Sequence, residues 1–222
     1  NQIVYTPASN FNGTETVTYT VSDGTVTDTG TLTITVTAAN DAPVAVDDTE
    51  TILEDAGLTN ITVLDDDTDV ENDSLTLSSV SLDDSSLGTV AINADNTTID
   101  FTPATDANGT ATVTYTVSDG TTTDTGDLVI TITAVNDAPV AVDDAETISE
   151  DDSATTFTVI DDDTDTESDS LSLSSITYTG TGTVSLSGNQ IVYTPASNFN
   201  GTETVTYTVS DGTATDTGTL TI

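Results

Sequence analysis

The 222-residue sequence contains no lysine, arginine or histidine, although it has 39 aspartate and glutamate residues and a formal charge of −39 at pH 7. No salt bridge between side chains can therefore form within the chain. Two carboxylates about 5 Å apart repel each other by roughly 3 kcal/mol at an effective dielectric constant of about 20. This charge excludes binding to nucleic acid or insertion at an anionic membrane surface, whereas a basic protein partner is compatible with it.

Cysteine is also absent, which excludes disulfides and thiolate metal sites. Without histidine the usual ligand of transition metals is missing, and the remaining oxygen donors favour hard cations, Ca²⁺ first. Nucleophile–base pairs that use histidine cannot form either, so we expect a protein that is not an enzyme. Paired carboxylates of the kind used in glycoside hydrolysis remain possible by residue type. However, carboxylates repeated in every module favour a structural role.

Long apolar segments are missing too. No run approaches the roughly 20 residues of a membrane span, and the N-terminus lacks the pattern of a signal peptide. We therefore expect an internal part of a longer protein, without membrane insertion.

Internal repetition organises what is present. Residues 1–34 return at 189–222 with one change, Val26 becoming Ala214, which sets a period of 188 residues. A shorter, more diverged period lies within it, because NDAPVAVDD at Asn40–Asp48 recurs at Asn136–Asp144. Self-similarity of this kind indicates a tandem array. We expect the C-terminal part of one module at 1–39, a complete module at 40–135 and a nearly complete one at 136–222.

Apolar residues alternate with threonine along most of each module, which predicts β-strands. The tyrosines that take part in this alternation are expected to be buried: Tyr19, Tyr115 and Tyr207. The complete module has seven strand candidates, at 43–52, 60–64, 74–80, 88–93, 97–103, 110–119 and 126–135. Seven strands in a module of this length predict an all-β fold of tandem seven-strand antiparallel β-sandwiches, immunoglobulin-like and arranged head to tail.

Acidic residues are concentrated in the loop after the second expected strand. LDDDTDVENDSL at Leu64–Leu75 has an acid at every second position, and IDDDTDTESDSL at Ile160–Leu171 repeats the pattern. A compact loop of this charge needs a cation from outside the chain, while the alternative is an extended, solvated turn. A generally acidic surface would spread its acids over the strand faces, which here carry threonine. The EF-hand pattern is excluded, because Val70 stands where that loop needs glycine.

Successive loops of an antiparallel sandwich fall at alternate ends. The module entrance at Asn40, the acidic loop and the turn at Asp119 should share one end, and the loops at Glu54 and Asp106 the other. Head-to-tail stacking would bring the acids of two modules to one junction, which suits the six to eight oxygen ligands of Ca²⁺. Asp119 and Asp211 are equally compatible with a role as turn residues. The candidate ligands are Asn40, Asp41, Glu54, Asp55, Asp65, Asp67, Asp69, Glu71, Asp73, Asp106, Asp119, Asn136, Asp137, Glu150, Asp151, Asp161, Asp163, Asp165, Glu167, Asp169 and Asp211.

NDAPVAVDD, TILEDAG, VLDDDTDVENDSL, FTPATDANGTATVTYTVSDG and ITITAVND together resemble the bacterial Ig-like or cadherin-like tandem repeats of giant RTX-type adhesins. The resemblance covers essentially the whole chain. It implies that linker residues, acids at the end of one domain and an Asp-x-Asp loop of the next hold Ca²⁺ together. At the second junction these would be Glu54 or Asp55, then Asn136, Asp137, Asp161 and Asp163, and at the first junction Asn40, Asp41, Asp65 and Asp67. The acidic motif that cadherins carry before their final strands has no clear equivalent in PATDANG.

These features predict a calcium-rigidified stalk of a secreted bacterial cell-surface adhesin, in which neighbouring repeats are joined through Ca²⁺. The alternative is a subunit of an extracellular filament, sheath or matrix fibre, with lateral or end-to-end self-association. It is motivated by the expected part-module at 1–39, because three strands with an open edge cannot bury a core alone. Strands equivalent to 1–34 are already present at 189–222, so head-to-tail strand exchange is not required.

Overall fold

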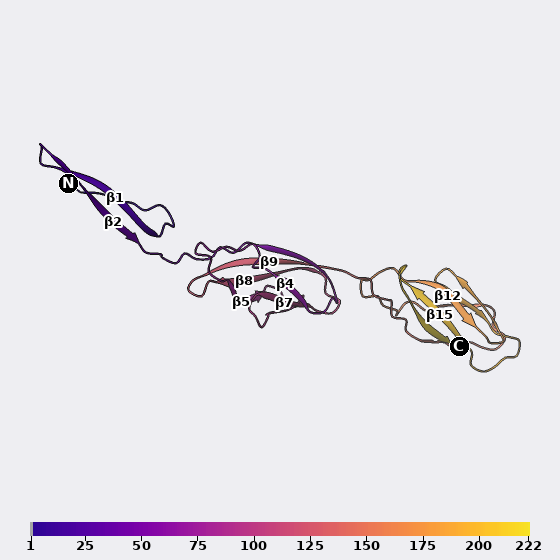
Figure 1. Cartoon of the computed structure of the whole chain (residues 1–222). Helices are drawn as coiled ribbons and strands as arrows, with labels where there is room; N and C mark the ends of the chain where they lie inside the picture. Colours follow the sequence, from indigo (N-terminus) through magenta and orange to yellow (C-terminus); the bar gives the residue numbers. More distant parts are fainter. Residues whose placement is uncertain (1) are drawn as a thin grey trace. The chain divides into compact units, whose positions relative to one another are not determined.

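The computed structural model describes residues 2–222, so Asn1, the first residue of the expected part-module, lies outside the described residues. The chain divides into a first unit, up to Ala134, and a second unit, Val135–Ile222. The described residues form no helix long and apolar enough to cross a membrane. Every regular element in the part of the chain that the structure describes is a β-strand (Figure 1), which confirms the all-β prediction.

The first unit contains a hairpin and a sandwich. The hairpin consists of β1 (Gly13–Ser22) and β2 (Thr27–Val36), which pair with each other along their whole length. The first sandwich has a four-stranded sheet, β3-β9-β8-β5, facing a three-stranded sheet, β4-β7-β6. Its strands are β3 (Asp48–Leu53), β4 (Thr59–Thr62), β5 (Thr76–Leu82), β6 (Gly88–Ile92), β7 (Thr98–Pro103), β8 (Gly109–Ser118) and β9 (Thr123–Thr133).

The second unit is a sandwich of the same design, with sheets β10-β16-β15-β12 and β11-β14-β13. Its strands are β10 (Asp144–Ala145), β11 (Thr155–Thr158), β12 (Ser172–Tyr178), β13 (Thr183–Ser187), β14 (Gln190–Thr194), β15 (Thr204–Ser210) and β16 (Thr215–Thr221). We call this the second sandwich.

The core of each sandwich comes from the alternation seen in the sequence. Val113, Tyr115 and Val117 on β8 are fully buried, and the threonines between them face outward or are only partly covered. Tyr115 lies opposite Gly126 on β9, where a side-chain Cβ would come within 2.6 Å of the tyrosine hydroxyl. Glycine is therefore required there to admit the ring, and Tyr207 and Gly218 repeat the pair in the second sandwich.

The expectation of a wholly antiparallel sandwich is wrong at the first strand. β3 pairs with β9 in parallel, and β10 pairs with β16 in the same way. Strand direction still alternates along the chain, so the first and seventh strands run the same way and must be parallel when they become neighbours. The first strand also starts later than predicted: Val44 forms only a bridge with Thr68, and β3 begins at Asp48.

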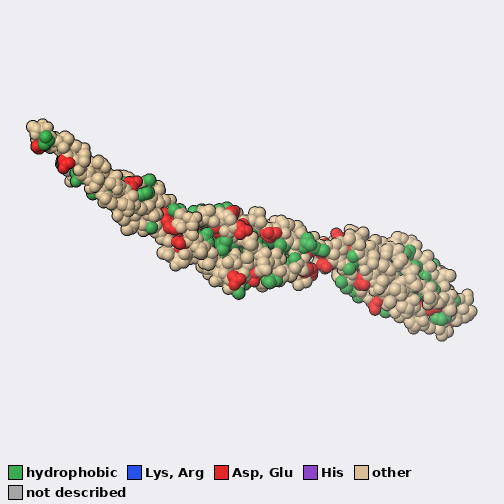
Figure 2. All heavy atoms as spheres, in the orientation of Figure 1, with side chains coloured by type: hydrophobic (Ala, Val, Ile, Leu, Met, Phe, Trp, Pro, Cys, Tyr) green, Lys and Arg blue, Asp and Glu red, His purple; other side chains and the backbone are tan. Residues whose placement is uncertain are grey.

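The hairpin departs from two further expectations. Of the three strands expected before residue 40, only β1 and β2 form; Gln2–Thr6 is not a strand, although its copy Gln190–Thr194 is β14. Tyr19 is 40% exposed, whereas its copy Tyr207 is fully buried. Both differences have one cause: β14 pairs with β11 and β13, and the hairpin has no facing sheet of this kind among the described residues. Figure 2 shows hydrophobic side chains open to solvent on this hairpin.

The two sandwiches differ at one buried position. Ala111 on β8 is fully buried, and its counterpart in the second sandwich is Glu203, which is only 7% exposed. The Glu203 carboxylate accepts hydrogen bonds from the hydroxyls of Tyr178 and Tyr193 and from the backbone N–H and hydroxyl of Thr181, the last two at 2.6 and 2.7 Å. Burial raises the pKa of Glu203, but these hydrogen bonds outweigh it and hold the pKa at about 2.

Replacing Glu203 with glutamine tests this network through the pH dependence of unfolding. Because the folded-state pKa of about 2 lies below the ordinary 4.5, the carboxylate contributes stability above pH 4.5 and loses it as the pH falls toward 2. With nearby solvent weakening the effect, we expect about 1–2 kcal/mol. Urea unfolding between pH 6 and 2 should show this loss in the wild type but not in Glu203→Gln. Parallel pH curves would contradict the assignment.

Candidate metal centre in the acidic loops

The acidic loop of the first unit, Leu64–Leu75, connects β4 to β5 and is fastened to the entering chain. Val44 and Thr68 exchange two backbone hydrogen bonds, at 2.7 and 3.1 Å. This bridge keeps the loop extended, so that its side chains continue to alternate. Asp67 and Asp69 are half-buried, while their neighbours Asp66, Thr68 and Val70 are exposed.

Each half-buried aspartate uses one carboxylate oxygen and leaves the other without a partner. Oδ1 of Asp67 accepts the Val46 N–H at 2.8 Å, and Oδ1 of Asp69 accepts the N–H groups of Glu71 and Asp73, both at 3.0 Å. The Oδ2 atoms of Asp67 and Asp69 are buried and have no hydrogen-bond partner among the described residues. An unpaired buried carboxylate oxygen costs free energy, which a bound cation would remove.

These two aspartates line one pocket. Its other lining residues include Asp73, the side-chain amide of Asn72 and the hydroxyl of Thr68. All of these groups offer oxygen atoms, and Ca²⁺ is the cation that most often takes such a mixed set of carboxylate, amide and backbone oxygens. The residues present therefore fit a calcium ion, with Asp67 and Asp69 as the central ligands.

The second unit repeats the arrangement at the equivalent residues. Oδ1 of Asp163 accepts the Val142 N–H at 2.8 Å, and Oδ1 of Asp165 accepts the Asp169 N–H at 2.9 Å. Both Oδ2 atoms are again buried without a partner in the described part of the chain. Asp161 and Asp169 join Asp163 and Asp165 in the lining of the pocket. The same pattern in two loops of different sequence indicates a built feature of the module.

The electrostatic environment disfavours the ionised form of the aspartate at the first of these positions. Burial raises the pKa of Asp67, the Val46 N–H opposes the rise, and the charges of Asp66 and Asp124 add to it. Burial likewise raises the pKa of Asp163. A cation would reverse the balance by stabilising the charged carboxylate.

The module entrance lies at the same end of the sandwich as the acidic loop, as predicted. The Asp41 N–H donates to Oε2 of Glu71 at 3.1 Å, and the Asp137 N–H donates to Oε2 of Glu167 at the same distance. The side-chain amide of Asn40 donates to Oδ2 of Asp119 at 2.8 Å, which joins the entrance to the β8–β9 turn. Asn136 and Asp211 make the equivalent contact at 3.0 Å.

Asp119 is held by its own turn. Its Oδ1 accepts the N–H groups of Thr121 and Thr122 at 2.6 and 2.7 Å, and its Oδ2 also accepts the Thr122 hydroxyl at 2.6 Å. The Thr122 hydroxyl and the Asn40 amide are the main causes that hold the pKa of Asp119 far below its ordinary value. A carboxylate with this many donors needs no metal ion, so the geometry favours the turn role over the ligand role.

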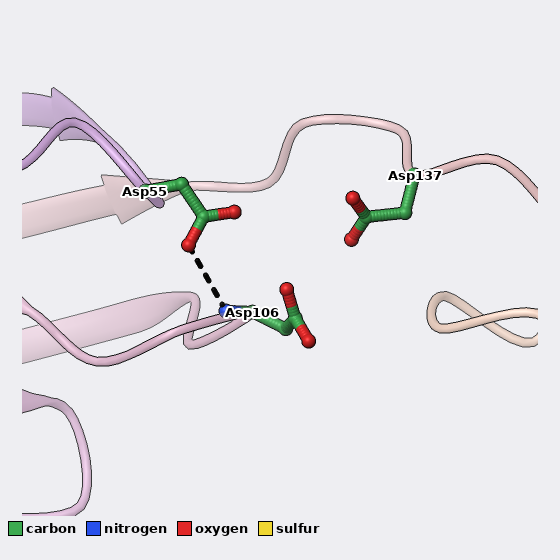
Figure 3. A group of neighbouring side chains, drawn as sticks. All are labelled: Asp55, Asp106 and Asp137. Atoms are coloured by element: carbon green, nitrogen blue, oxygen red, sulfur yellow. Dashed lines mark hydrogen bonds between the residues drawn. The ribbon is translucent and has the colours of Figure 1, made fainter.

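The other end of the first sandwich has a smaller acidic group. Asp55 and Asp106 are exposed, offer carboxylate oxygens within 4.8 Å of each other, and are linked by the Asp106 N–H, which donates to Oδ1 of Asp55 at 3.4 Å. Figure 3 shows this pair, and it also labels Asp137, which belongs to the second unit. Glu54 is buried beside the pair and accepts the Asn108 amide at 3.3 Å. Two adjacent carboxylates form part of a cation site but do not complete one.

In the second unit the corresponding group carries less charge. Asn198 replaces Asp106, and its N–H donates to Oδ1 of Asp151 at 2.8 Å. Glu150, unlike Glu54, is exposed. The remaining candidates, Asp65 and Asp161, are exposed as well, and Asp161 lines the pocket of its loop.

Sequence reasoning did not assign several acids that fasten the first strand. Oδ2 of Asp124 accepts the Ala45 N–H at 3.0 Å, Oδ1 of Asp47 accepts the Asp127 N–H at 2.9 Å, and Asp48 accepts the Tyr115 hydroxyl at 3.0 Å. The recurrence of the Thr-Asp-Thr-Gly tetrapeptide in all three copies was the available signal for Asp124. These contacts show that part of the acidic charge serves the fold.

Substitution of Asp69 with asparagine should weaken calcium binding selectively. Asparagine keeps the Oδ1 acceptor for Glu71 and Asp73 but places an NH₂ group where the unpaired Oδ2 lies. We expect the affinity of the first unit for Ca²⁺ to fall about tenfold or more, which corresponds to about 1.4 kcal/mol. Isothermal titration calorimetry measures it, with Asp66→Asn as the matched control, because Asp66 is exposed in the same loop. Equal losses in both variants would indicate a general charge effect and would contradict a site at Asp69.

Family comparisons agree with the two kinds of module. Residues 1–35 and 136–222 match the bacterial Ig domain, and residues 40–134 match the bacterial cadherin-like domain. No curated protein matches the sequence.

Solved structures show the fold alone. The chain is similar to human CDH23 EC21-23, with 17% identity and a TM-score of 0.53 over 94% of this chain and 74% of that one. It is also similar to the protocadherin GammaB4 extracellular domain, with 16% identity and a TM-score of 0.51 over 95% of this chain and 40% of that one. An endo-fucoidan hydrolase from glycoside hydrolase family 107 shares 21% identity at a TM-score of 0.36, over 98% of this chain and 34% of the hydrolase. This chain thus spans about a third of the hydrolase.

The family match to the bacterial Ig domain covers more than half of the sequence, on both sides of the cadherin-like residues. The chain therefore belongs to the bacterial Ig domain family and includes a bacterial cadherin-like domain at residues 40–134.

Proposed function

We propose that this chain is a calcium-rigidified segment of an extended stalk, which holds the binding domain of a secreted bacterial adhesin away from the cell surface. Domains of these two families are structural, typically extracellular and generally non-enzymatic. The observation that carries the calcium part of the proposal is the pair of buried, unpaired carboxylate oxygens in each acidic loop, at Asp67 and Asp69 and again at Asp163 and Asp165.

Calcium would act within each module by joining groups that otherwise repel. In the first sandwich, Asp67 and Asp69 lie in a loop that is hydrogen-bonded to the entering chain through Val46, Thr68 and Glu71. An ion on the two aspartates would hold the loop against the entrance and so fix the direction in which the chain enters the module. We propose the same role for Asp163 and Asp165.

Calcium would also join neighbouring modules. Asp55 and Asp106 at the far end of the first sandwich supply an incomplete set of ligands. We propose that linker residues Asn136 and Asp137, together with the acidic loop of the following module, complete it. Extracellular modules commonly bind Ca²⁺ with dissociation constants of about 10⁻⁴–10⁻³ M. Such sites would be empty in the low calcium of the cytosol and filled outside, which suits export of a flexible chain through an RTX-type secretion route.

Small-angle X-ray scattering tests the rigidification. We expect the maximum dimension of the full chain to increase and its distribution of interatomic distances to sharpen when millimolar Ca²⁺ replaces chelator. A variant with Asp67, Asp69, Asp163 and Asp165 all changed to asparagine should scatter alike in both conditions. Identical scattering of the wild type with and without Ca²⁺ would contradict the stalk proposal even if calcium binds.

A second candidate, the subunit of an extracellular filament or matrix fibre, is favoured by one observation. The β1–β2 hairpin exposes Tyr19, Val21 and Leu32, which are residues of a sandwich core. Filament assembly would cover them. Electron micrographs of the calcium-loaded protein that show laterally ordered or end-to-end fibres would support this candidate over separate stalks.

A further inference from the structure

One sequence occurs twice in this chain in two structural states. Residues 189–222 complete the second sandwich, where Tyr207, Val209 and Leu220 are fully buried. Their copies in the first unit, Tyr19, Val21 and Leu32, are 40%, 58% and 39% exposed. The two segments differ only at Val26 and Ala214, so the difference lies in what faces them. The partner that covers the second copy is residues 136–188, which form β10 to β13.

We propose that residues 2–34 are a docking surface for residues 136–188 of a second copy of this chain. There they would take the place of residues 189–222 and link copies head to tail. The exchange uses contacts that this chain already makes internally, so the partner is chosen by the observed fit of the same sequence. The proposal does not depend on calcium and deepens the filament candidate.

The backbone pairing transfers without adjustment. β12 pairs with β15 so that Thr177 lies opposite Thr206 and Ile176 opposite Tyr207. The period of 188 residues places Thr18 and Tyr19 at these two positions. Gln2–Thr6 would form the strand that Gln190–Thr194 forms between β11 and β13. The absence of that strand from the first unit then follows from the absence of its two neighbours.

The hairpin is already in the conformation that docking needs. Tyr19 lies opposite Gly30, as Tyr207 lies opposite Gly218. A Cβ at Gly30 would come within 2.7 Å of the Tyr19 hydroxyl, so the ring covers the glycine in the same way as in the complete sandwich. Docking would therefore lose little conformational freedom in β1 and β2, which favours association.

Glu15 makes the surface selective for one kind of module. Its copy Glu203 accepts hydrogen bonds from Tyr178 and Thr181, both of which lie within residues 136–188. In the first sandwich the equivalent residue is Ala111, and its surroundings include Leu82 and Leu87 at the core edge. A carboxylate placed there would lose its solvation without gaining these donors. The hairpin should thus complete the Ig-type sandwich and reject the cadherin-like one.

Residues 189–222 of the same chain compete for this surface because they are covalently attached. Exchange requires that they leave, so linkage should appear when copies refold together at high concentration or when residues 189–222 cannot dock. Both situations can be created in the full-length chain.

The first test uses disulfide trapping in a chain that has no native cysteine. Directly opposite residues of antiparallel strands have Cα atoms about 4.5–5.5 Å apart, which suits a disulfide. The variant Thr18→Cys with Thr177→Cys, refolded from denaturant at high concentration and oxidised, should give covalent dimers and longer multimers. The matched control is Thr18→Cys with Ser81→Cys, because Ser81 lies opposite Thr114 in the cadherin-like sandwich as Thr177 lies opposite Thr206. It should remain monomeric.

Equal multimers in trap and control would contradict the selectivity, and disulfide-linked monomers alone would contradict exchange between copies. A second variant removes the competing segment by Val205→Asp and Val209→Asp. It should form a concentration-dependent ladder of masses in light scattering and keep the melting transition of the second sandwich. Adding Val17→Asp and Val21→Asp should abolish both. A monomer that lacks this transition before the additional changes would overturn the proposal.

Discussion

Millimolar Ca²⁺ is expected to raise the melting temperature of both sandwiches by about 10–20 °C relative to excess chelator. At a free concentration of about 100 times the dissociation constant, one site that binds only the folded state adds roughly 2.7 kcal/mol. For domains of this size, each 1 kcal/mol shifts the melting temperature by about 4–8 °C. The buried Oδ2 atoms of Asp67, Asp69, Asp163 and Asp165 are the reason that the effect should occur in both units.

Differential scanning calorimetry provides the measurement, with Mg²⁺ and sodium chloride as controls. Mg²⁺ demands a small octahedral site and gives up its water reluctantly, so it should shift the transitions much less. Added salt screens the general repulsion of 39 acids without occupying a site. Equal shifts with all three additions, or none, would leave the acidic loops as solvated surface and remove the calcium sites from the proposed function. Docking of residues 2–34 would be unaffected, because it depends on different residues.

Ala111→Glu is expected to unfold the first sandwich, or to destabilise it by about 3–5 kcal/mol, which is typical of an uncompensated buried charge. The substitution makes the β8 sequence TETVTYT, identical to that of the second sandwich, where the glutamate is accommodated. The difference lies in the donors: Tyr178 and Thr181 serve Glu203, whereas Ala111 is fully buried within an apolar cluster. Local sequence and strand propensity are thus held constant while the surroundings change.

Chemical denaturation of the full chain measures this effect, since the second sandwich provides an internal reference. Thr110→Glu is the matched control, because Thr110 is exposed on the same strand and should change stability little. If Ala111→Glu unfolds like the wild type, glutamate finds donors in the first sandwich, and Glu15 cannot distinguish the two kinds of module.

The strands were predictable because burial on one face imposes a period of two along the sequence. Val113, Tyr115 and Val117 follow it without interruption, and each is fully buried. The parallel pairing of β3 with β9 was not predictable from that period, which reports the face of a residue but not its neighbouring strand. The exposure of Tyr19 could not be foreseen either, because its sequence is that of Tyr207 and only the missing sheet separates them.

The candidate site was predictable as a region and less so as a set of atoms. Alternating acids in Leu64–Leu75 located the loop, but every second residue looked equivalent. The structure separates Asp67 and Asp69, with buried unpaired oxygens, from the exposed Asp65. Asp119 differs again, since its turn supplies the donors. These distinctions depend on backbone N–H groups, such as that of Val46, which sequence patterns do not place.

The contrast between the two tyrosines has a consequence for proteolysis. Proteases that cleave after lysine or arginine find no site in this sequence, folded or unfolded. Proteases that cleave after aromatic residues find Phe101, Tyr115, Tyr193 and Tyr207 within sandwich cores, whereas Tyr19 is open on the hairpin. Cleavage by a chymotrypsin-like enzyme should therefore begin in the hairpin, and docking to a second copy would remove that first point of attack.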